Sequence, residues 1–282
     1  MDFAKWEALG NDYVIIDAES AGFEPSPERI SLLCDRHLGI GSDGVLLIGT
    51  PQSPGAVASL RIFNPDGSEA ELSGNGARQA LLFLHREGRA PASRFAIETP
   101  AGEVRAEILA EDRARVDMGR ASTRSAGYPE GDDEGRGSIA AGGELWSFRH
   151  VSIGNPQCVI RVDDTDVLEG LQISAFGAEI EGAPAFPERT NVSWWSELEP
   201  GRIRARLFER GVGETSASGT GACGAAVDYV LRGAGPDVIV EMDGGELEVT
   251  VGEDLHIDLT GTASELFRGT VSPELRARLD LA

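Results

Sequence analysis

The stretch Glu69-Ala70-Glu71-Leu72-Ser73-Gly74-Asn75-Gly76-Ala77 recurs later in the chain as Glu214-Thr215-Ser216-Ala217-Ser218-Gly219-Thr220-Gly221-Ala222. Three further pairs keep the same order and nearly the same spacing. They are Gly10-Asn11 with Gly154-Asn155, Arg61-Ile62-Phe63-Asn64 with Arg206-Leu207-Phe208-Glu209, and Gly102-Glu103-Val104 with Gly245-Glu246-Leu247. Four matches in one register indicate an internal duplication. Their period of about half the chain indicates two similar domains rather than a solenoid.

Each half is predicted to contain the same elements in the same order. Residues 76–85 and 222–232 are apolar nearly all round, which is typical of buried helices. Shorter helices are expected at 27–37 and 167–171, and a Gly- and Ser-rich connection at 119–143. The strands expected around them lie at 13–17, 45–48, 59–64, 94–118, 146–162, 191–209 and 238–259.

The sequence therefore predicts an α+β fold of two pseudo-symmetric domains. Each domain is expected to be a curled, mostly antiparallel sheet around one central helix, with a cleft between the two domains. The expected domain boundaries are residues 1–117, completed by residues 265–282, and residues 118–264.

Composition narrows the classes of function. The chain has 282 residues, of which 47 are acidic and 25 are basic, so its formal charge is −22. Nucleic acid and membranes are not expected partners, because binding to either needs clustered positive charge. No apolar run is long enough to span a membrane, and residues 1–5 show no signal-peptide pattern. An odd number of cysteines, at no metal or disulfide spacing, favours the reduced cytoplasm: Cys34, Cys158 and Cys223.

Lys5 is the single lysine of the chain. Enzymes that use pyridoxal phosphate hold it through a Schiff-base lysine, so this cofactor is not expected. No other cofactor and no metal is predicted.

The repeated Ser-Gly-x-Gly segments, at Ser73 and Ser218, stand just before the two predicted buried helices. Small residues there leave backbone N–H groups uncovered at the positive end of the helix dipole, which suits an anion. The alternative is that the glycines only permit a tight turn into a closely packed helix. Because the feature occurs twice at matched positions, an anion site that holds a carboxylate is favoured.

Asn64 and Glu209 occupy equivalent strand ends, and Arg210 follows Glu209. A carboxylate and a guanidinium beside an anion site suit a ligand with both ammonium and carboxylate groups. A surface Glu-Arg pair is the alternative and would contribute little. Asn11 and Asn155 form a third matched pair, for which ordinary turn residues are the alternative.

These motifs together resemble the diaminopimelate epimerase family, from residue 3 to about residue 270. The stretches that carry the resemblance are Gly10-Asn11-Asp12-Tyr13-Val14, Gly39-Ile40-Gly41-Ser42-Asp43-Gly44, Asn64-Pro65-Asp66-Gly67-Ser68-Glu69, Ser73-Gly74-Asn75-Gly76-Ala77-Arg78, Gly154-Asn155-Pro156, Thr190-Asn191-Val192 and Glu209-Arg210-Gly211-Val212-Gly213-Glu214-Thr215.

The resemblance implies two pseudo-symmetric α/β domains and a cofactor-independent inversion at the α-carbon of an amino acid. In the family one cysteine removes the α-proton and a second cysteine, on the opposite face, returns a proton. The corresponding positions here are Ser73 and Ser218. The resemblance further implies that the reacting carboxylate is bound by Gly74, Asn75, Gly219 and Thr220. The remaining amino and carboxylate groups would be bound by Asn11, Asn64, Asn155, Asn191, Glu209 and Arg210.

The chain departs from the family pattern at both catalytic positions, where serine replaces cysteine, and at Gln157, where many members have histidine. A thiol is readily deprotonated at a helix N-terminus, whereas a serine hydroxyl needs a neighbouring base. Glu69, Glu214 and Glu209 are the glutamates that could supply one. Each cysteine of the chain is better explained by packing than by catalysis.

Three explanations of the serines stay open: replacement by design to hold substrate unreacted, a natural serine enzyme assisted by a glutamate, or a relative of the same fold with different chemistry. The expected activity is the conversion of LL-diaminopimelate to the meso form by a cytoplasmic isomerase. Its expected partners are a small amino-acid substrate and a second copy in a homodimer. The alternatives are an inactive amino-acid-binding homologue, and an isomerase or dehydratase of the same fold acting on another amino or hydroxy acid.

Overall fold

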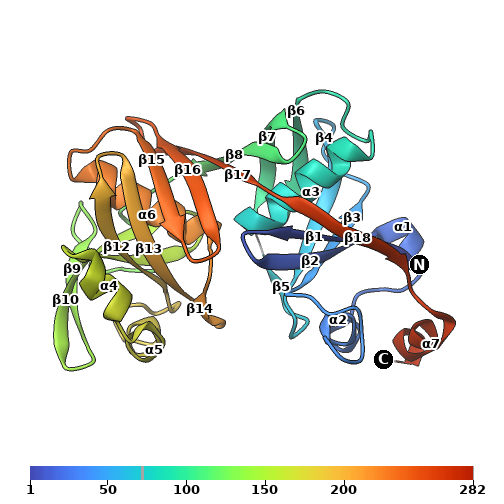
Figure 1. Ribbon diagram of the computed structural model, residues 1–282, viewed down its shortest axis with the longest axis horizontal. Helices are drawn as coiled ribbons and strands as arrows, with labels where there is room; N and C mark the ends of the chain where they lie inside the picture. The colour runs from blue at the N-terminus through green and yellow to red at the C-terminus, as the bar shows by residue number, and fades with distance from the viewer. Residues whose placement is uncertain (71–72, 282) are drawn as a thin grey trace. The chain divides into compact units, whose positions relative to one another are not determined.

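The computed structural model describes residues 1–70 and 73–281 (Figure 1). Glu71 and Leu72, which belong to the repeated stretch, lie outside the described residues. The chain divides into two compact units. The first unit is Met1–Val116 together with Gly261–Ala282, and the second unit is Asp117–Thr260. The boundaries expected from the sequence, 117/118 and 264/265, lie slightly further along the chain.

The strands of the first unit form one mixed sheet. They are β1 (Asp2–Ala8), β2 (Asn11–Asp17), β3 (Val45–Gly49), β4 (Ala56–Phe63), β5 (Glu69–Ala70), β6 (Arg94–Thr99), β7 (Gly102–Ala110), β8 (Arg113–Arg120) and β18 (Ser264–Thr270). Neighbours in this sheet follow the order β18-β1-β2-β3-β4-β6-β7-β8, and β5 pairs with β4. All of these pairs are antiparallel except β2–β3 and β4–β6.

The second unit repeats this topology strand for strand. Its strands are β9 (Arg136–Ala141), β10 (Glu144–Ser152), β11 (Pro156–Arg161), β12 (Asn191–Glu199), β13 (Arg202–Glu209), β14 (Gly213–Thr215), β15 (Asp237–Met242), β16 (Gly245–Val251) and β17 (His256–Thr262). The order is β9-β10-β11-β12-β13-β15-β16-β17, with β14 beside β13. The parallel pairs, β11–β12 and β13–β15, occupy the same positions as those of the first unit. The predicted duplication and the mostly antiparallel α+β fold are confirmed.

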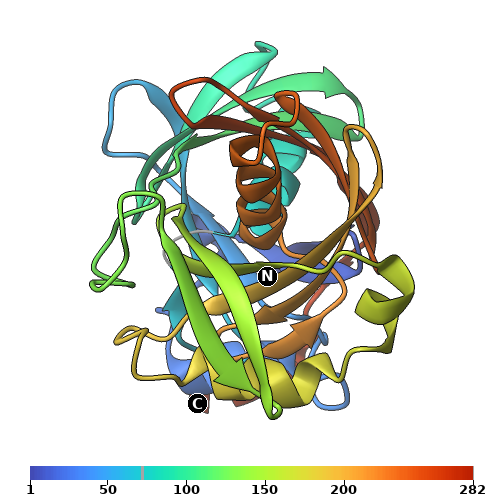
Figure 2. The same ribbon diagram turned by 90° about the vertical axis from the view of Figure 1, so that its left-hand side faces the viewer.

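One long helix is buried in each unit. α3 (Gly74–Arg86) packs against strands of the first unit and α6 (Gly219–Leu231) against strands of the second. In α3 every residue from Gly74 to Leu84 is buried, and in α6 every residue from Gly219 to Tyr229. Figure 2 shows α6 running along the inside of the curved strands of its unit. The prediction of a central buried helix in each domain is confirmed.

The two helices begin earlier than predicted, at Gly74 and Gly219 rather than at residues 76 and 222. Their glycines are therefore part of the first helical turn. This happens because Ser73 and Ser218 cap the helices, so that the small residues behind them can take helical geometry.

The remaining helices lie outside the curved sheets. They are α1 (Ala18–Ala21), α2 (Pro27–Cys34), α4 (Thr165–Gly170), α5 (Ile173–Glu181) and α7 (Pro273–Leu281). The expected helix at 27–37 was too long, because the Asp35 carboxylate accepts the N–H groups of His37 and Leu38 and ends α2 there. The expected connection at 119–143 also contains β9. No helix of the described residues is long and apolar enough to cross a membrane.

Candidate active site

Each buried helix begins at a serine whose hydroxyl caps the first turn. Ser73 Oγ accepts a hydrogen bond of 3.1 Å from the N–H of Gly76, and Ser218 Oγ accepts one of 3.2 Å from the N–H of Gly221. A serine in this position stabilises a helix by about 1 kcal/mol. The same bond holds the hydroxyl oxygen at the positive end of the helix dipole, where negative charge is favoured.

Packing explains one glycine in each of these first turns. A Cβ at Gly221 would lie 2.8 Å from Leu207 Cδ2, and a Cβ at Gly76 would lie 3.1 Å from Leu46 Cδ2. Each helix start is thus pressed against a strand of its own unit. The tight-turn interpretation of the repeated motif therefore holds for Gly76 and Gly221, whose own N–H groups are bonded to the capping serines.

In the second unit the serine is bonded to a carboxylate. The hydroxyl of Ser218 donates a hydrogen bond of 2.9 Å to Glu209 Oε2, and the hydroxyl of Thr215 donates one of 2.8 Å to Glu209 Oε1. Burial raises the pKa of Glu209 above its ordinary value, and the two hydroxyl donors offset only part of that rise. Glu209 is thus a carboxylate that takes up a proton more readily than a glutamate in water.

The matched position of the first unit has a different chemistry. Asn64 stands where the second repeat has Glu209, and its amide donates a hydrogen bond of 2.9 Å to Ser68 rather than to Ser73. Ala70 stands where the second repeat has Thr215. Within residues 1–70 and 73–281, no carboxylate is bonded to Ser73.

The other two glutamates considered as bases are bonded to arginines. Both oxygens of Glu69 accept hydrogen bonds from Arg61, at 2.8 and 2.7 Å, which lowers the pKa of that carboxyl group. Glu214 accepts hydrogen bonds from Arg206 at 2.5 Å and from Ser174 at 2.8 Å. Of the three candidates, Glu209 is therefore the glutamate that contacts a catalytic-position serine.

The amides predicted in the second unit surround the start of α6. Asn155 donates a hydrogen bond of 3.3 Å to Thr220 Oγ1 and accepts one of 2.8 Å from Gln157. Gln157 is fully buried, and its Oε1 has no hydrogen-bond partner among the described residues. A buried acceptor without a partner costs about 1–3 kcal/mol, so Gln157 is held here at a cost in stability.

Asn191 and Arg210 lie together at the end of β13. Asn191 Oδ1 accepts a hydrogen bond of 2.9 Å from the backbone N–H of Arg210, and Asn191 Nδ2 donates one of 3.2 Å to the carbonyl of Pro156. The Arg210 side chain is exposed and donates to the carbonyl of Glu188 at 2.9 Å. Arg210 and Glu209 are therefore not bonded to each other, and the interpretation of a surface Glu-Arg pair is wrong.

In the first unit the predicted amides are held by charged neighbours. Asn75 is buried and its Oδ1 accepts a hydrogen bond of 2.9 Å from Arg78, which is itself fully buried. Asn11 donates a hydrogen bond of 3.4 Å to Asp43, and its carbonyl accepts one of 2.9 Å from Gln79. Gln157, Thr215 and Arg78 were not among the predicted site residues. The repeat alignment could have identified Thr215, because its hydroxyl replaces a methyl group at Ala70.

The cysteines lie in the hydrophobic interior. Cys34 and Cys158 belong to apolar clusters of the first and second unit, and burial raises the pKa of both thiols. Cys223 is buried within α6. Among the residues that the structure describes, no three His, Cys, Asp or Glu side chains are grouped as metal ligands would be.

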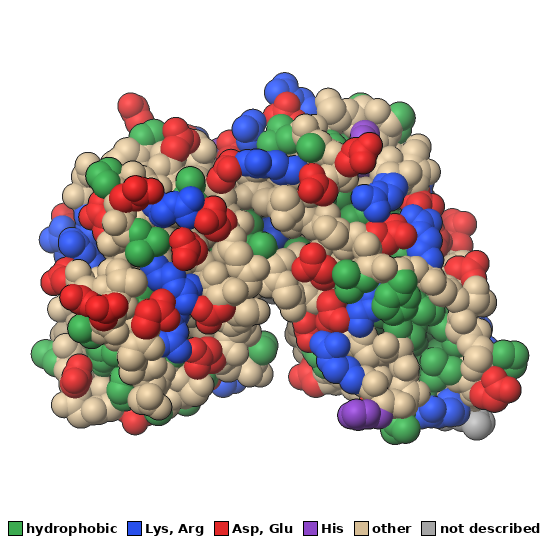
Figure 3. Space-filling model, in the orientation of Figure 1, with side chains coloured by type: hydrophobic (Ala, Val, Ile, Leu, Met, Phe, Trp, Pro, Cys, Tyr) green, Lys and Arg blue, Asp and Glu red, His purple; other side chains and the backbone are tan. Residues whose placement is uncertain are grey.

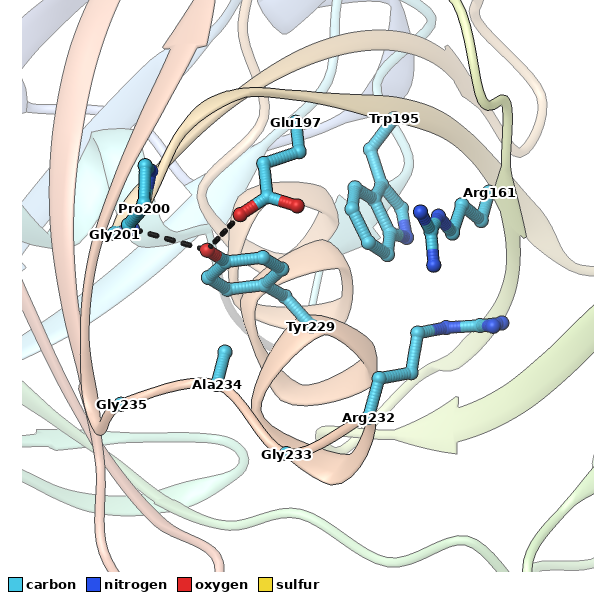
Figure 4. A pocket seen from close by; sticks show the side chains of 10 residues that line it. All are labelled: Arg161, Trp195, Glu197, Pro200, Gly201, Tyr229, Arg232, Gly233, Ala234 and Gly235. Carbon is cyan, nitrogen blue, oxygen red and sulfur yellow. Dashed lines mark hydrogen bonds between the residues drawn. The ribbon is translucent and has the colours of Figure 1, made fainter.

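The second unit also has a cavity of about 320 Å³, which contains none of the predicted site residues (Figure 4). It lies at the C-terminal end of α6, whereas Ser218 lies at the N-terminal end. Tyr229 donates a hydrogen bond of 2.7 Å to Glu197 inside it and accepts one of 3.0 Å from the N–H of Gly201. The guanidinium groups of Arg161 and Arg232 both lie against the Trp195 ring.

Comparison with known proteins gives the same assignment over the whole length of the chain. The sequence profile described as diaminopimelate epimerase matches residues 3–124 and 149–266. A protein named diaminopimelate epimerase in Pelotomaculum thermopropionicum is 41% identical over 279 residues, which are 95% of this chain and 98% of that protein. A protein named diaminopimelate epimerase 2 in Nostoc sp. strain PCC 7120 is 40% identical, over 98% of both chains.

Solved structures of low sequence identity share the fold. A probable proline racemase from Agrobacterium radiobacter K84 superimposes with a TM-score of 0.72 at 16% identity, over 96% of this chain and 93% of that one. A hydroxyproline epimerase from Agrobacterium vitis superimposes with a TM-score of 0.71 at 16% identity, over 97% and 94% of the two chains. The two-unit fold, the profile match and the identity to named relatives establish that this chain belongs to the diaminopimelate epimerase family, a family of isomerases.

Proposed function

We propose that the protein inverts one α-carbon of LL-diaminopimelate to give the meso form, by two-base proton transfer and without a cofactor. The reaction would serve lysine and cell-wall precursor synthesis. The observation that carries this proposal is the matched pair of capping serines, Ser73 and Ser218, at the positions where the family has its two catalytic cysteines. Membership of the family and the names of its relatives support the substrate.

The two serines would hold the proton-transfer positions. Inversion requires that one of them removes the α-proton while the other supplies a proton from the opposite face. The charge left on the carbon spreads into the substrate carboxylate, which is stabilised by N–H groups at the positive end of a helix dipole. In this proposal Gly74, Asn75, Gly219 and Thr220 bind that carboxylate, and the other groups are bound by Asn11, Asn64, Asn155, Asn191, Glu209 and Arg210.

Independence of pyridoxal phosphate is part of the proposal. Lys5 has 6% of its surface exposed. Its ammonium group lies 2.6 Å from Asp12 and also donates to the carbonyl of Gly41. To form a Schiff base this ammonium group would have to lose its proton and leave a buried ion pair, which is costly.

We further propose a cytoplasmic enzyme whose partners are its amino-acid substrate and a second copy in a homodimer. Neither nucleic acid nor a membrane is a partner in this proposal, because a formal charge of −22 opposes binding to phosphate-rich surfaces. Three buried cysteines are in keeping with a reducing compartment.

The test is incubation of the protein with LL- or meso-diaminopimelate in D₂O, without added pyridoxal phosphate. We expect deuterium at the α-carbon and interconversion of the two isomers, measured by mass spectrometry and chiral chromatography. The matched control is the double variant Ser73→Ala/Ser218→Ala, which removes both hydroxyl groups at a cost of about 1 kcal/mol per lost helix cap and is expected to be inactive.

Two outcomes would contradict the proposal. Binding of diaminopimelate without deuterium incorporation would indicate an amino-acid-binding homologue, and turnover of a different amino or hydroxy acid would indicate divergent chemistry. The double variant Ser73→Cys/Ser218→Cys distinguishes a slow epimerase from a binding homologue and from an enzyme with divergent chemistry. Restored thiols should raise the inversion rate if the scaffold is that of an epimerase, because a thiolate forms far more readily than an alkoxide.

A further inference from the structure

The cavity at the C-terminal end of α6 has charged groups of both signs on its walls (Figure 4). Its volume of about 320 Å³ is at the lower end of the range for small-molecule sites, which is about 300–1,000 Å³. All 10 lining residues belong to the second unit, and none of them is assigned to the proposed reaction. The cavity is therefore a candidate site of its own, independent of the proposed function.

Two arginines of this cavity hold their guanidinium groups against one indole ring. Arg161 and Arg232 lie 5.6 and 5.9 Å from the centre of the Trp195 ring. The Nε of Arg232 donates to Asp228 at 2.9 Å. The Nε of Arg161 lies 3.2 Å from Asp163. Among the described residues, none accepts a hydrogen bond from the terminal nitrogens of either arginine. Each guanidinium is thus held at its Nε while its terminal N–H groups stay open, and such a fork suits a carboxylate or a phosphate.

A buried carboxylate fixes the floor of the cavity. Asp228 is fully buried and accepts hydrogen bonds from Trp195 Nε1 at 3.0 Å and from Arg149 at 2.7 Å, besides the one from Arg232. Trp195 is only 1% exposed, so its ring cannot move far. The ring and the Arg232 guanidinium therefore have their positions before a ligand arrives. Groups that are already in place lose little freedom on binding, which favours affinity.

A hydrogen-bonded Tyr-Glu pair supplies the opposite charge. In Figure 4, Tyr229 and Glu197 lie on one side of the Trp195 ring, and the two guanidinium groups lie on the other side. Burial raises the pKa of Tyr229 above its ordinary value of 10, so the hydroxyl keeps its proton and donates to Glu197 Oε1 at 2.7 Å. Glu197 Oε2 accepts no hydrogen bond from a described residue. This carboxylate oxygen is open to an ammonium group.

These groups select for a ligand that carries both charges. A phosphate ester would meet the Glu197 carboxylate and a chain of formal charge −22, and a simple amine would meet two guanidinium groups. We propose that the cavity is a second amino-acid site, in which Arg161 and Arg232 bind the carboxylate of a free amino acid and Glu197 binds its ammonium group. Arg232 is the C-cap of α6 and Ser218 is its N-cap, so the amino acid binds at the opposite end of this helix from the proposed reaction.

The experiment measures binding of three probes with the same aliphatic chain to the full-length protein by isothermal titration calorimetry. L-Norleucine carries both charged groups, hexanoate lacks the ammonium group and pentylamine lacks the carboxylate. We expect norleucine to bind at least about 10-fold more tightly than either, since each lost charged hydrogen bond weakens binding by about this factor. Norleucine should also shift the indole N–H signal of Trp195 in the NMR spectrum of ¹⁵N-labelled protein, with Trp195→Phe used to assign that signal.

Matched variants locate the binding. Arg161→Met and Glu197→Gln each remove one charge from the cavity at an exposed position, and glutamine keeps an oxygen that can accept from Tyr229. Both variants are expected to fold, which thermal unfolding checks, and to bind norleucine at least about 10-fold more weakly than the wild type. Arg124→Met and Glu199→Gln are the controls, because they remove the same charges at exposed positions of the second unit outside the cavity. Both controls should bind norleucine as the wild type does.

Several results would overturn the proposal. If hexanoate or pentylamine binds as tightly as norleucine, the site does not recognise a zwitterion. Norleucine binding that is unchanged in Arg161→Met and Glu197→Gln, or that leaves the Trp195 signal in place, would lie elsewhere on the protein. No binding of norleucine at millimolar concentration would show that the cavity is not an amino-acid site. The proposed function is tested separately, by deuterium incorporation into diaminopimelate.

Discussion

The Ser218 hydroxyl donates its hydrogen bond directly to the carboxylate of Glu209. Burial raises the pKa of this carboxyl group above its ordinary value of 4.5. A carboxyl group of this kind stabilises the fold while it is protonated. Its contribution is complete below its ordinary pKa and is lost as the pH rises through the raised value. At neutral pH the charged Glu209 is therefore retained at a cost in stability.

We predict that Glu209→Gln unfolds at a temperature equal to or higher than that of the wild type at pH 7.5, although it loses activity. The gain should shrink toward pH 4.5, where the wild-type carboxyl group is increasingly protonated. Thermal unfolding followed by circular dichroism at the two pH values measures this. Glu214→Gln is the control, because it removes an ion pair with Arg206 and is expected to be neutral or slightly destabilising. A variant that is less stable than the wild type at pH 7.5 but not at pH 4.5 would contradict the prediction.

His150 is predicted to make the fold sensitive to acid. It is fully buried, its Nε2 lies 2.8 Å from the Ser125 hydroxyl, and burial lowers its pKa from 6.5 to about 4. The stability that comes from keeping this ring neutral is complete above pH 6.5 and is lost as the pH falls through the lowered pKa. The whole loss is on the order of 3 kcal/mol, at 1.36 kcal/mol per pKa unit.

Urea unfolding of wild type and His150→Gln between pH 7 and pH 4 tests this prediction. The variant is expected to be less stable at pH 7, because its side chain packs less well against Tyr128, but to lose less stability on acidification. His37→Gln, at an exposed position, should retain the acid sensitivity of the wild type. Parallel pH curves for wild type and His150→Gln would show that other groups cause the acid sensitivity.

Among the carboxylates of the second unit, Asp228 is predicted to be the one whose replacement lowers the free energy of unfolding most. It is fully buried in α6 and accepts hydrogen bonds from Arg149 at 2.7 Å, Trp195 at 3.0 Å and Arg232 at 2.9 Å. Asp228→Asn leaves the buried Arg149 without its charged partner, which typically costs about 3–5 kcal/mol. Asp163→Asn is the control, since that carboxylate is 90% exposed and its ion pair with Arg161 contributes about 0–1 kcal/mol. Equal losses of unfolding free energy in both variants would contradict the prediction.

The acidic excess predicts that salt stabilises the protein. Acidic side chains are spread over the face shown in Figure 3, and a formal charge of −22 favours expansion of the chain through self-repulsion. Sodium chloride at 1 M shortens the screening length to about 3 Å, from about 10 Å at 0.1 M. We expect the unfolding temperature at pH 7.5 to rise between these concentrations. The rise should be much smaller near pH 4.5, where the net charge approaches zero, and an equal rise at both pH values would point to a cause other than charge.

Much of the fold could be predicted because the internal duplication shows each main element twice in the sequence. The central helices, the order of the strands and the capping serines each appear twice in the sequence at matched positions, as with Ser73 and Ser218. Helix ends could not be placed as well, because they depend on single hydrogen bonds. The carboxylate of Asp35 ends α2 by accepting two backbone N–H groups. The spacing of apolar residues, from which the helix was predicted, does not reveal such a contact.

The site could be predicted as a set of residues but not as a network of bonds. Glu69, Glu209 and Glu214 were equivalent candidates in the sequence, because none of them is adjacent to a catalytic-position serine. In the folded protein the three glutamates differ in the side chains that they contact, and those side chains lie elsewhere in the sequence or on another strand. Arg61 and Arg206 lie opposite Glu69 and Glu214, which leaves Glu209 to accept from Ser218.

The chain returns to the first unit after it has formed the second, and this affects the order in which the two units can fold during synthesis. Strand β1 pairs with β18 from Asp2 opposite Thr270 to Glu7 opposite Ser264, so one edge of the first sheet is completed by residues that leave the ribosome after all of Asp117–Thr260. The contiguous second unit can fold as soon as it emerges, whereas the unit that is synthesised first must wait with an unpaired strand edge. We therefore expect the second unit to mature before the first during translation, and the edge of β1 to stay unpaired until β18 has been synthesised.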